Sequence, residues 1–270
     1  MRVHLFGDQD AGSFANILLS IGNGEIPVNQ ADGQISIPNG CCTLASNLTE
    51  LITHVYPNIS QNYKTREWLC ERAILAPKND MVSFINQKIL KNIPEEEKFY
   101  RSIDKTLSED EAIQFPTEFL NSLSPSGMPP HVLSLKMGAP VILLRNLDPP
   151  RLCNGTRLVV KQLLPHVIEA TIMTGQYAGD HVFVPRIPLI SSELGFDFKR
   201  IQFPLKLCFA MSINKAQGQS LKVTGLHLDS PCFSHGQLYV GCSRVGSSRG
   251  LFVLAPNGKT VNVVYPQVLQ

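Results

Sequence analysis

Four stretches of the chain carry apolar residues at helical spacing. The predicted helices cover residues 13–21, 43–55, a stretch that begins at Asn79, and 234–243. The first is the clearest, because Phe14, Leu18 and Ile21 fall on one face and Gly22 follows the run. At the third helix, the side chain of Asn79 is of the kind that caps a helix N-terminus.

Short runs of apolar and β-branched residues predict the strands. The run Ala73–Ala76 has no polar residue, as is typical of a parallel strand that is buried on both faces. The other predicted strands cover residues 141–144, 156–164, 167–174, 181–184, 205–210, 223–228 and 251–255.

Strands alternate with helices on both sides of a stretch that is only β-prone. This order predicts an α/β sheet that is interrupted by a small barrel. The barrel is expected over 155–203, between a first part of the sheet domain at 1–154 and a second part at 204–270. Residues 91–130 are charged and then rich in proline and serine, so they are expected to form a surface insertion with a short helix near Glu118–Leu123.

The composition is that of an ordinary globular protein, with 43% apolar and 17% charged residues among 270. The formal net charge of +2 is too small to identify a nucleic-acid binder, so any DNA contact must come from a few well-placed basic groups. No apolar run reaches the roughly 18 residues that a membrane helix needs. The seven cysteines include no C-x-x-C pair, so neither a zinc site nor a disulfide framework is expected.

The block AMSINKAQGQS (Ala210–Ser220) follows a predicted strand and is rich in hydrogen-bond donors. Ser212 is expected to open a helix there, with Asn214, Lys215 and Gln217 on its first turn. A hydroxyl, amides, an ammonium group and exposed backbone N–H groups suit a phosphate backbone, and they bind it without reading its sequence. The alternative is a polar helix start that binds no ligand.

The block HGQLYVGCSR (His235–Arg244) predicts a helix with an arginine at its end. The guanidinium of Arg244 is a rigid fork of donors that suits two phosphate oxygens. The alternative is an arginine that only stabilises the C-terminal end of its own helix through the helix dipole.

These two blocks, in this order, resemble motifs V and VI of superfamily-one DNA helicases of the Pif type, named for petite integration frequency. Helitron transposons also carry such helicases. Two other stretches continue the resemblance, AILAPKNDMVSFINQKIL (Ala73–Leu90) and KMGAPVILLRNLDPPRLCNGTRLVV (Lys136–Val160). The resemblance implies an α/β fold, namely a RecA-like second motor domain with an inserted small SH3-like barrel.

The resemblance also implies roles for single residues. Ser212, Asn214, Lys215 and Gln217 would contact single-stranded DNA. Gly218 and Gln219 would lie near the nucleotide cleft, and Arg244 would point at the phosphates of ATP. Met1-Arg2-Val3 resembles the end of an Asn-Met-Arg motif of the family, which implies that Arg2 also faces these phosphates.

The second block departs from the usual GQLYVALSR form of the family at Gly241 and Cys242. Both residues are small enough to pack, but a glycine inside a helix costs about 1 kcal/mol relative to alanine.

The phosphate-binding pattern G-x-x-x-x-G-K-[ST] does not occur in the 270 residues. Asn257–Thr260 contains GKT, but Val253 stands where the first glycine of the pattern would be, and no helix is expected to follow. We therefore expect ATP and Mg²⁺ to bind only together with an N-terminal motor half, which is an expected partner along with single-stranded DNA.

Two hypotheses follow. In the first, the chain is the C-terminal half of an ATP-dependent 5′-to-3′ DNA helicase of repair, recombination and telomere maintenance, inactive by itself. In the second, it is a transposon-derived module that binds single-stranded DNA or another partner without catalysis. A nuclear location is expected, with the mitochondrion as the other option and no membrane.

Overall fold

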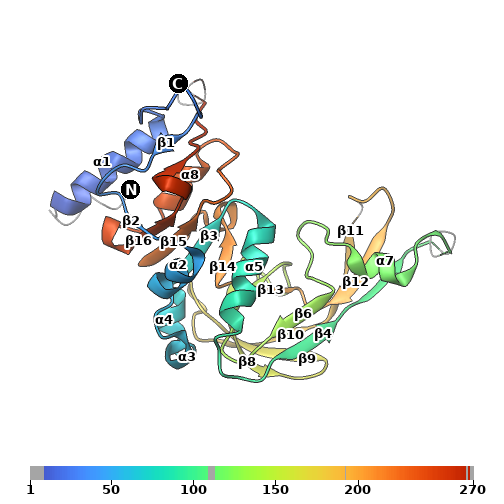
Figure 1. Cartoon of the computed structure of the whole chain (residues 1–270). Helices are drawn as coiled ribbons and strands as arrows, with labels where there is room; N and C mark the ends of the chain where they lie inside the picture. Colours follow the sequence, from blue (N-terminus) through green and yellow to red (C-terminus); the bar gives the residue numbers. More distant parts are fainter. Residues whose placement is uncertain (1–8, 109–112, 192, 266, 268–270) are drawn as a thin grey trace. The chain divides into compact units, whose positions relative to one another are not determined.

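The computed structural model describes residues 9–108, 113–191, 193–265 and 267 (Figure 1). The chain divides into two compact units. The first combines the chain up to Ile89 with the chain from Phe209 onward, and the second is formed by Leu90–Cys208. In sequence, the second unit is therefore inserted into the first.

A five-stranded sheet in which all strands are parallel forms the centre of the first unit. Its strands are short, apolar and mostly buried, as expected where both faces of a parallel sheet are covered. This confirms the predicted strands at 73–76, 223–228 and 251–255. In spatial order they are β14 (Ala210–Ser212), β3 (Arg72–Ala76), β15 (Val223–His227), β16 (Leu251–Leu254) and β2 (Thr43–Leu44).

Helices cover both faces of this sheet. A Cβ atom on Gly225 of β15 would lie 2.8 Å from Val55 of α2 (Leu48–Val55). The next residue, Leu226, instead faces α8 (Gln237–Cys242), where a Cβ atom on Gly241 would meet its Cδ2. Because consecutive side chains of a strand point to opposite faces, α2 and α8 lie on opposite sides of the sheet.

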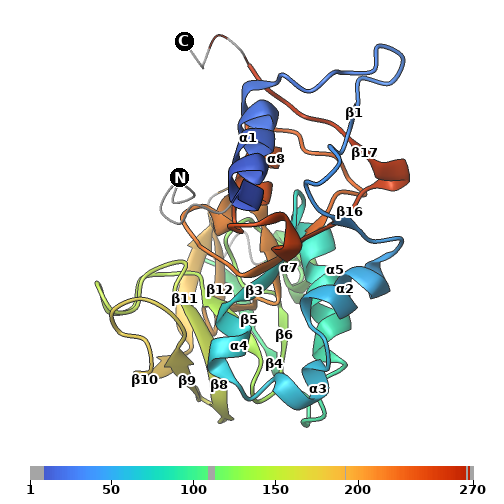
Figure 2. The same cartoon turned by 90° about the vertical axis from the view of Figure 1, so that its left-hand side faces the viewer.

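The helix α1 (Gln9–Asn23) packs on α8 and adds a further layer on that side (Figure 2). It confirms the predicted helix over 13–21, although it continues past Gly22. Apart from α5, which is described next, the remaining helical segments of the unit are short: α3 (Ile59–Asn62), α4 (Arg66–Cys70), and the 3-10 segments η2 (Ile213–Ala216), η3 (Ser248–Gly250) and η4 (Pro256–Gly258).

The open edge of the sheet at β14 is covered by a side chain of α5 (Asn79–Leu90). The Nδ2 group of Asn86 donates to the Ala210 carbonyl at 2.9 Å, and the Ala210 N–H donates to Asn86 Oδ1 at 2.8 Å. Asn86 thus takes the place of a neighbouring strand at this point and satisfies backbone groups that an edge leaves unpaired. The apolar face of α5 is buried at Ile85 and Ile89.

A two-stranded antiparallel ribbon joins distant parts of the first unit. Its strands are β1 (Ile35–Ser36) and β17 (Lys259–Thr260). The GKT sequence therefore lies at the start of a strand and not before a helix, as predicted. Lys259 pairs with Asp32 at 3.1 Å.

The second unit consists mainly of antiparallel strands. One sheet has the order β10 (His181–Pro185), β9 (Val167–Ile172), β8 (Arg157–Leu163), β7 (Pro140–Leu143) and β13 (Leu205–Leu207); a second has the order β11 (Ile187–Ser191), β12 (Phe198–Gln202) and β5 (Ile103–Thr106); the third pairs β4 (Lys98–Arg101) with β6 (Val132–Leu135). The strands predicted at 141–144, 156–164, 167–174 and 181–184 are confirmed. The short helix expected near Glu118–Leu123 is α7 (Thr117–Ser122).

Residues 91–130 are more than a surface insertion, which corrects that expectation. They supply β4 and β5, and β5 pairs with β12 from Phe198↔Thr106 to Ile201↔Ile103. The second unit consequently extends beyond 155–203 on both sides. Local patterns cannot show this, because the strand partners are distant in sequence.

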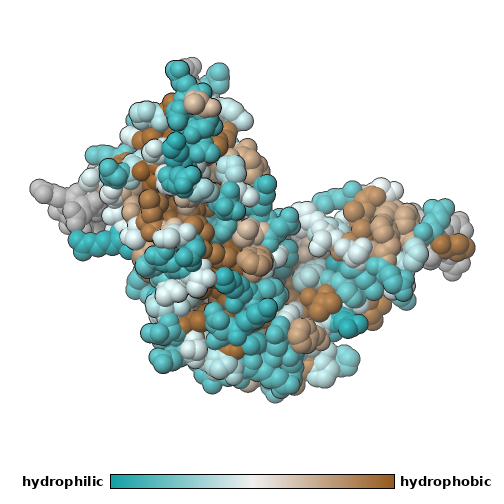
Figure 3. All heavy atoms as spheres, viewed as in Figure 1, coloured by the Kyte–Doolittle hydropathy of each residue, from teal (hydrophilic) through white to brown (hydrophobic). Residues whose placement is uncertain are grey.

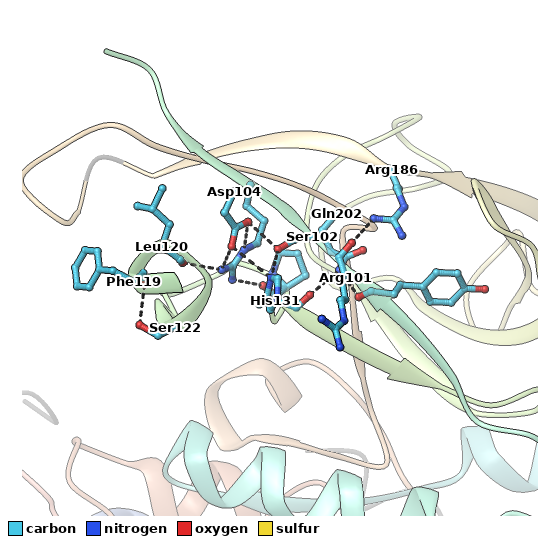
Figure 4. A network of polar contacts seen from close by, with 12 residues as sticks. Arg101, Ser102, Asp104, Phe119, Leu120, Ser122, His131, Arg186 and Gln202 are labelled. Atoms are coloured by element: carbon cyan, nitrogen blue, oxygen red, sulfur yellow. Dashed lines mark hydrogen bonds and ion pairs between the residues drawn. The ribbon is translucent and has the colours of Figure 1, made fainter. Parts of the chain in front are cut away.

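A buried ion pair connects the elements of the second unit. The Nε and Nη2 atoms of Arg200 donate to the two carboxylate oxygens of Asp104 at 2.8 and 2.6 Å, and neither side chain is exposed. Ser102 and His131 lie beside the carboxylate, and Leu120 offers a carbonyl to the guanidinium (Figure 4). The pair therefore fastens β5, β12 and α7 together.

Three predicted element boundaries were wrong. The predicted strand over 205–210 is two strands, because Leu205–Leu207 pairs antiparallel with β7 and Ala210–Ser212 pairs parallel with β3. The helix predicted over 43–55 begins only at Leu48, because Thr43 and Leu44 pair with β16 and the side chain of Asn47 accepts a hydrogen bond from the Glu50 N–H at 3.0 Å.

The third wrong boundary concerns the helix predicted over 234–243. The observed helix α8 is shorter than this prediction at both ends. It begins after Gly236, whose φ of +67° lies in the left-handed region.

Candidate functional site

The first motif block lies directly after the edge strand β14. Ser212 ends the strand, and Asn214 and Lys215 lie on η2. Ile213 and Ala216 are buried and anchor this segment, so Asn214 and Lys215 project into solvent. Ser212 is half-buried and makes no capping hydrogen bond.

Ser212 does not open an α-helix, which corrects the prediction. The segment is a single 3-10 turn of four residues, because Gln217 adopts φ −58° and ψ 131° and leaves the helical region. Gly218 follows with φ +82°, and the Gln219 N–H donates to the Ala216 carbonyl at 3.0 Å. These values define a type II β-turn over 216–219, whose third position requires a left-handed φ and therefore favours glycine.

The segment 212–219, which we call the polar turn, presents a compact set of donors. Asn214, Lys215, Gln217 and Gly218 are exposed in it. Two amides and an ammonium group within four residues suit the oxygens of a phosphate backbone. These side-chain donors are present even though the segment does not form the predicted N-terminus of an α-helix.

Gln219 differs from these residues because it is half-buried. Its Nε2 group donates to the Lys215 carbonyl at 3.2 Å. Its Oε1 atom is buried and has no hydrogen-bond partner among the described residues. Burial therefore sets Gln219 apart from the exposed donors, whereas Gly218 is exposed with them. That both residues lie near a nucleotide cleft stays a prediction.

The guanidinium of Arg244 connects the second block to the polar turn. Its Nη1 atom donates to the carbonyl oxygens of Ala216 at 3.3 Å and of Gln219 at 3.1 Å. Its Nε donates to the Val240 carbonyl at 2.7 Å, and its Nη2 donates to Ser243 Oγ at 2.7 Å. Arg244 is therefore beside the polar turn and half-buried, and one Nη2 hydrogen has no partner in the described part of the chain.

Partial burial also affects the charge of this group. Burial lowers the pKa of Arg244, and the nearby Tyr239 opposes that change. An arginine keeps its charge over the physiological range regardless, because its ordinary pKa is above 12. The site thus contains one permanent cation fixed by four hydrogen bonds.

A second contact between the blocks was not predicted from the sequence. Gln237 is only 2% exposed, and its Nε2 group donates to Asn214 Oδ1 at 3.5 Å. Its Oε1 accepts a hydrogen bond from the Phe233 N–H at 3.0 Å. The sequence contained one signal for this contact, a glutamine at the start of an otherwise apolar helix. A buried side-chain amide needs hydrogen-bond partners for both its oxygen and its nitrogen.

The two departures of the second block have a packing reason. Gly241 faces Leu226 so closely that a Cβ atom would lie 2.9 Å from its Cδ2. Cys242 is buried, and its hydrogen bond with the Cys41 thiol, together with burial, raises the pKa of Cys242 well above its usual value. The small residues therefore let α8 lie close to β15 and to the segment around Cys41.

Arg2, the other predicted phosphate-facing arginine, lies outside the described residues. Its assignment stays a prediction. No helix among the described residues is long and apolar enough to cross a membrane.

Sequence comparisons connect the chain to one group of DNA helicases. The profile "DNA helicase Pif1, 2B domain" matches residues 118–163. An ATP-dependent DNA helicase PIF1 from Xenopus laevis is 32% identical over 197 residues, which are 73% of this chain and 29% of the relative. The ATP-dependent DNA helicase PIF6 from Trypanosoma brucei brucei is 36% identical over 135 residues, which are 46% of this chain and 16% of the relative. The chain thus spans less than a third of these relatives.

Solved structures show the same mixed α/β fold. The crystal structure of Pif1 helicase from Candida albicans aligns with a TM-score of 0.62 and 23% identity, covering 97% of this chain and 57% of that one. The Pif1 helicase from Bacteroides in complex with ADP-AlF3 and ssDNA aligns with a TM-score of 0.61 and 19% identity, covering 97% of this chain and 53% of that one.

Proposed function

Because the chain belongs to the Pif1 family of DNA helicases, we propose that it is the C-terminal motor half of an ATP-dependent, 5′-to-3′ DNA helicase. In this proposal the first unit is the RecA-like second motor domain, and the second unit is the inserted domain with the SH3-like barrel. Two observations support the proposal: the second unit is inserted in the sequence of the first, and the first unit contains a parallel sheet.

The observation that carries the proposal is that Arg244, the last residue of the second block, reaches the first block. Its guanidinium donates to the carbonyls of Ala216 and Gln219, so the polar turn and the cation form one cluster. On the exposed side of that cluster, Asn214, Lys215 and Gln217, with Ser212 behind them, would hold the phosphates of single-stranded DNA. Contacts to phosphates are independent of base sequence, which a moving helicase requires.

Arg244 would act on the nucleotide. The transferred phosphoryl group gains negative charge that a nearby arginine stabilises, with an effect of about a thousandfold or more on the rate. Arg244 is a permanent cation and has one Nη2 hydrogen left for such an oxygen in the described part of the chain. Arg2 would contribute a second cation, as the family resemblance implies.

ATP and Mg²⁺ would be held mainly by the other motor half. The described residues contain no group of three or more His, Cys, Asp or Glu side chains that could hold a metal ion. This chain's contribution is then the guanidinium and the DNA contacts, and we propose that it does not hydrolyse ATP by itself. Roles in DNA repair, recombination and telomere maintenance, and a nuclear or mitochondrial location, belong to the same proposal.

A reconstitution experiment tests the proposal. Hydrolysis of ATP is measured with single-stranded DNA for this chain alone and after adding the N-terminal remainder of a Pif1 relative. We expect no turnover from the chain alone, turnover from the mixture, and a loss of about a thousandfold with Arg244→Ala. The control is Arg66→Ala on α4, which removes one arginine that pairs with Glu67 outside both blocks.

Two outcomes would contradict the proposal. Turnover in the mixture that survives Arg244→Ala unchanged would show that this arginine does not act on ATP. Binding of single-stranded DNA without turnover under any of these conditions would favour the second candidate, a non-catalytic module, for which the exposed donors of the polar turn already suffice.

A further inference from the structure

We infer that Arg244 is also a positioning residue for DNA, because its guanidinium holds the polar turn in the shape that presents Asn214, Lys215 and Gln217. This inference rests on the proposed function, since it assumes that the polar turn binds single-stranded DNA. It assigns Arg244 a role that does not require ATP.

The hydrogen bonds of Arg244 close the type II turn over 216–219, the last part of the polar turn, at both ends. Ala216 and Gln219 are the first and last residues of the type II turn, and Nη1 donates to the carbonyls of both. The Ala216 carbonyl also accepts the Gln219 N–H that defines the turn. One side chain therefore fixes the distance between the two ends of the turn.

The guanidinium is itself held from the other side. Its Nε donates to the Val240 carbonyl and its Nη2 donates to Ser243 Oγ, so the helix α8 determines where the fork points. Hydrogen bonds from an ionised donor are shorter and stronger than those between neutral groups. Half-burial strengthens them further, because less water competes for the carbonyls.

The middle of the turn has no comparable support. Gln217 and Gly218 are exposed, and nothing lies within 4 Å of a Cβ atom placed on Gly218. Gly218 has a φ of +82° here, but a glycine in a free chain adopts many other backbone conformations. The shape of the turn therefore depends on what holds its ends. Without the fork of Arg244, we expect the donors to sample several arrangements, which weakens DNA binding.

A lysine cannot replace the arginine in this role. Its ammonium group keeps the charge but lacks the planar fork. Only that fork reaches the carbonyls of Ala216, Gln219 and Val240 and the hydroxyl of Ser243 at the same time. The comparison of Arg244→Ala with Arg244→Lys therefore separates positioning from long-range attraction of DNA.

The test is the binding of a fluorescent oligodeoxythymidylate to the full chain, without nucleotide, measured by anisotropy. We expect both Arg244→Ala and Arg244→Lys to lower the affinity at least about tenfold. Arg66→Ala removes the same charge on α4 and should leave the affinity within about twofold. Circular dichroism of each variant checks that it is folded.

A second pair of variants reaches the same turn without changing charge. Gly218→Ala should weaken binding, because alanine disfavours the left-handed φ although its methyl group meets no neighbour. Gly33→Ala is the matched control, since Gly33 has φ +67° and equally open surroundings in a segment outside the polar turn. These variants also decide the question if the Arg244 variants do not fold.

The outcomes are distinguishable. Wild-type affinity in both Arg244 variants, or wild-type affinity in Arg244→Lys alone, would overturn the positioning role. Wild-type affinity in Gly218→Ala would overturn it as well. A wild-type chain that binds no oligonucleotide would instead contradict the DNA contacts of the proposed function.

Discussion

A methyl group on Gly241 of α8 would lie 2.9 Å from Cδ2 of Leu226 on β15. Alanine in place of glycine would favour the helix by about 1 kcal/mol. Overpacking a closely packed site costs about 1–3 kcal/mol, and Leu226 is itself fully buried and cannot move far. We therefore expect Gly241→Ala to lower the free energy of unfolding by about 1 kcal/mol, measured by urea denaturation.

The control for this prediction is Gly12→Ala in α1. Gly12 is also helical, but nothing lies within 4 Å of a Cβ atom at this position. The same substitution should then raise the free energy of unfolding by up to about 1 kcal/mol. Stabilisation of both variants would show that Leu226 adapts and that close packing does not explain the glycine.

The ion pair of Asp104 and Arg200 yields a second prediction. Asp104→Asn leaves the fully buried guanidinium of Arg200 without its charge partner. Breaking a buried pair in this way costs about 3–5 kcal/mol. Urea denaturation should show this loss for the second unit, and hydrogen exchange should show it in β5 and β12.

The matched variant removes both charges, as Asp104→Leu with Arg200→Met. Replacement of a buried pair by apolar residues is often nearly neutral, because the desolvation cost disappears along with the attraction. The double variant should be more stable than Asp104→Asn. Equal or greater loss in the double variant would show that the bonds to Leu120, Pro129 and Ser102 matter more than the charges.

His227 at the end of β15 yields a pH prediction. Burial lowers the pKa of His227 below its ordinary 6.5, and the nearby Asp229 opposes this change. The unfolded chain then takes up the proton more readily than the folded one. The contribution of neutral His227 to the stability of the folded chain is complete above pH 6.5. It is lost as the pH falls from 6.5 through the lower pKa that His227 has in the folded state.

Unfolding free energies between pH 5 and 8 check this prediction (about 1.4 kcal/mol per pH unit is the limit for one proton). His227→Gln should make the pH dependence shallower below pH 6.5, while the same change at the exposed His166 should leave the His227-dependent slope in place. A steeper or unchanged slope in His227→Gln would contradict the assignment.

The second unit also exposes apolar surface that the sequence did not indicate. Figure 3 shows such surface near β11 and α7, and the large apolar residues exposed on this three-stranded sheet and on α7 are Ile103, Phe119 and Ile190. Ile103 and Ile190 alternate with buried residues on the short strands β5 and β11, neither of which was among the predicted strands.

Local patterns predicted those helices and strands that depend mainly on their own residues. The buried run at β3, the amphipathic α1 and the β-prone stretch from β8 to β10 are of this kind. The predictions failed where a distant partner decides the structure. Thr43 and Leu44 are a strand only because β16 lies beside them, and Leu205–Ser212 divides because its two ends pair with different sheets.

The same distinction applies to the candidate site. The order of the residues, through its resemblance to the family motifs, was enough to single out the donors from Ser212 to Gln219 and the arginine at position 244. It did not contain the contact between them. Arg244 reaches carbonyls 25 and 28 residues away, and that contact exists only because α8 and η2 pack against each other in the folded chain. Hydrogen bonds act over about 3 Å, so only the tertiary structure could decide which donors and acceptors meet.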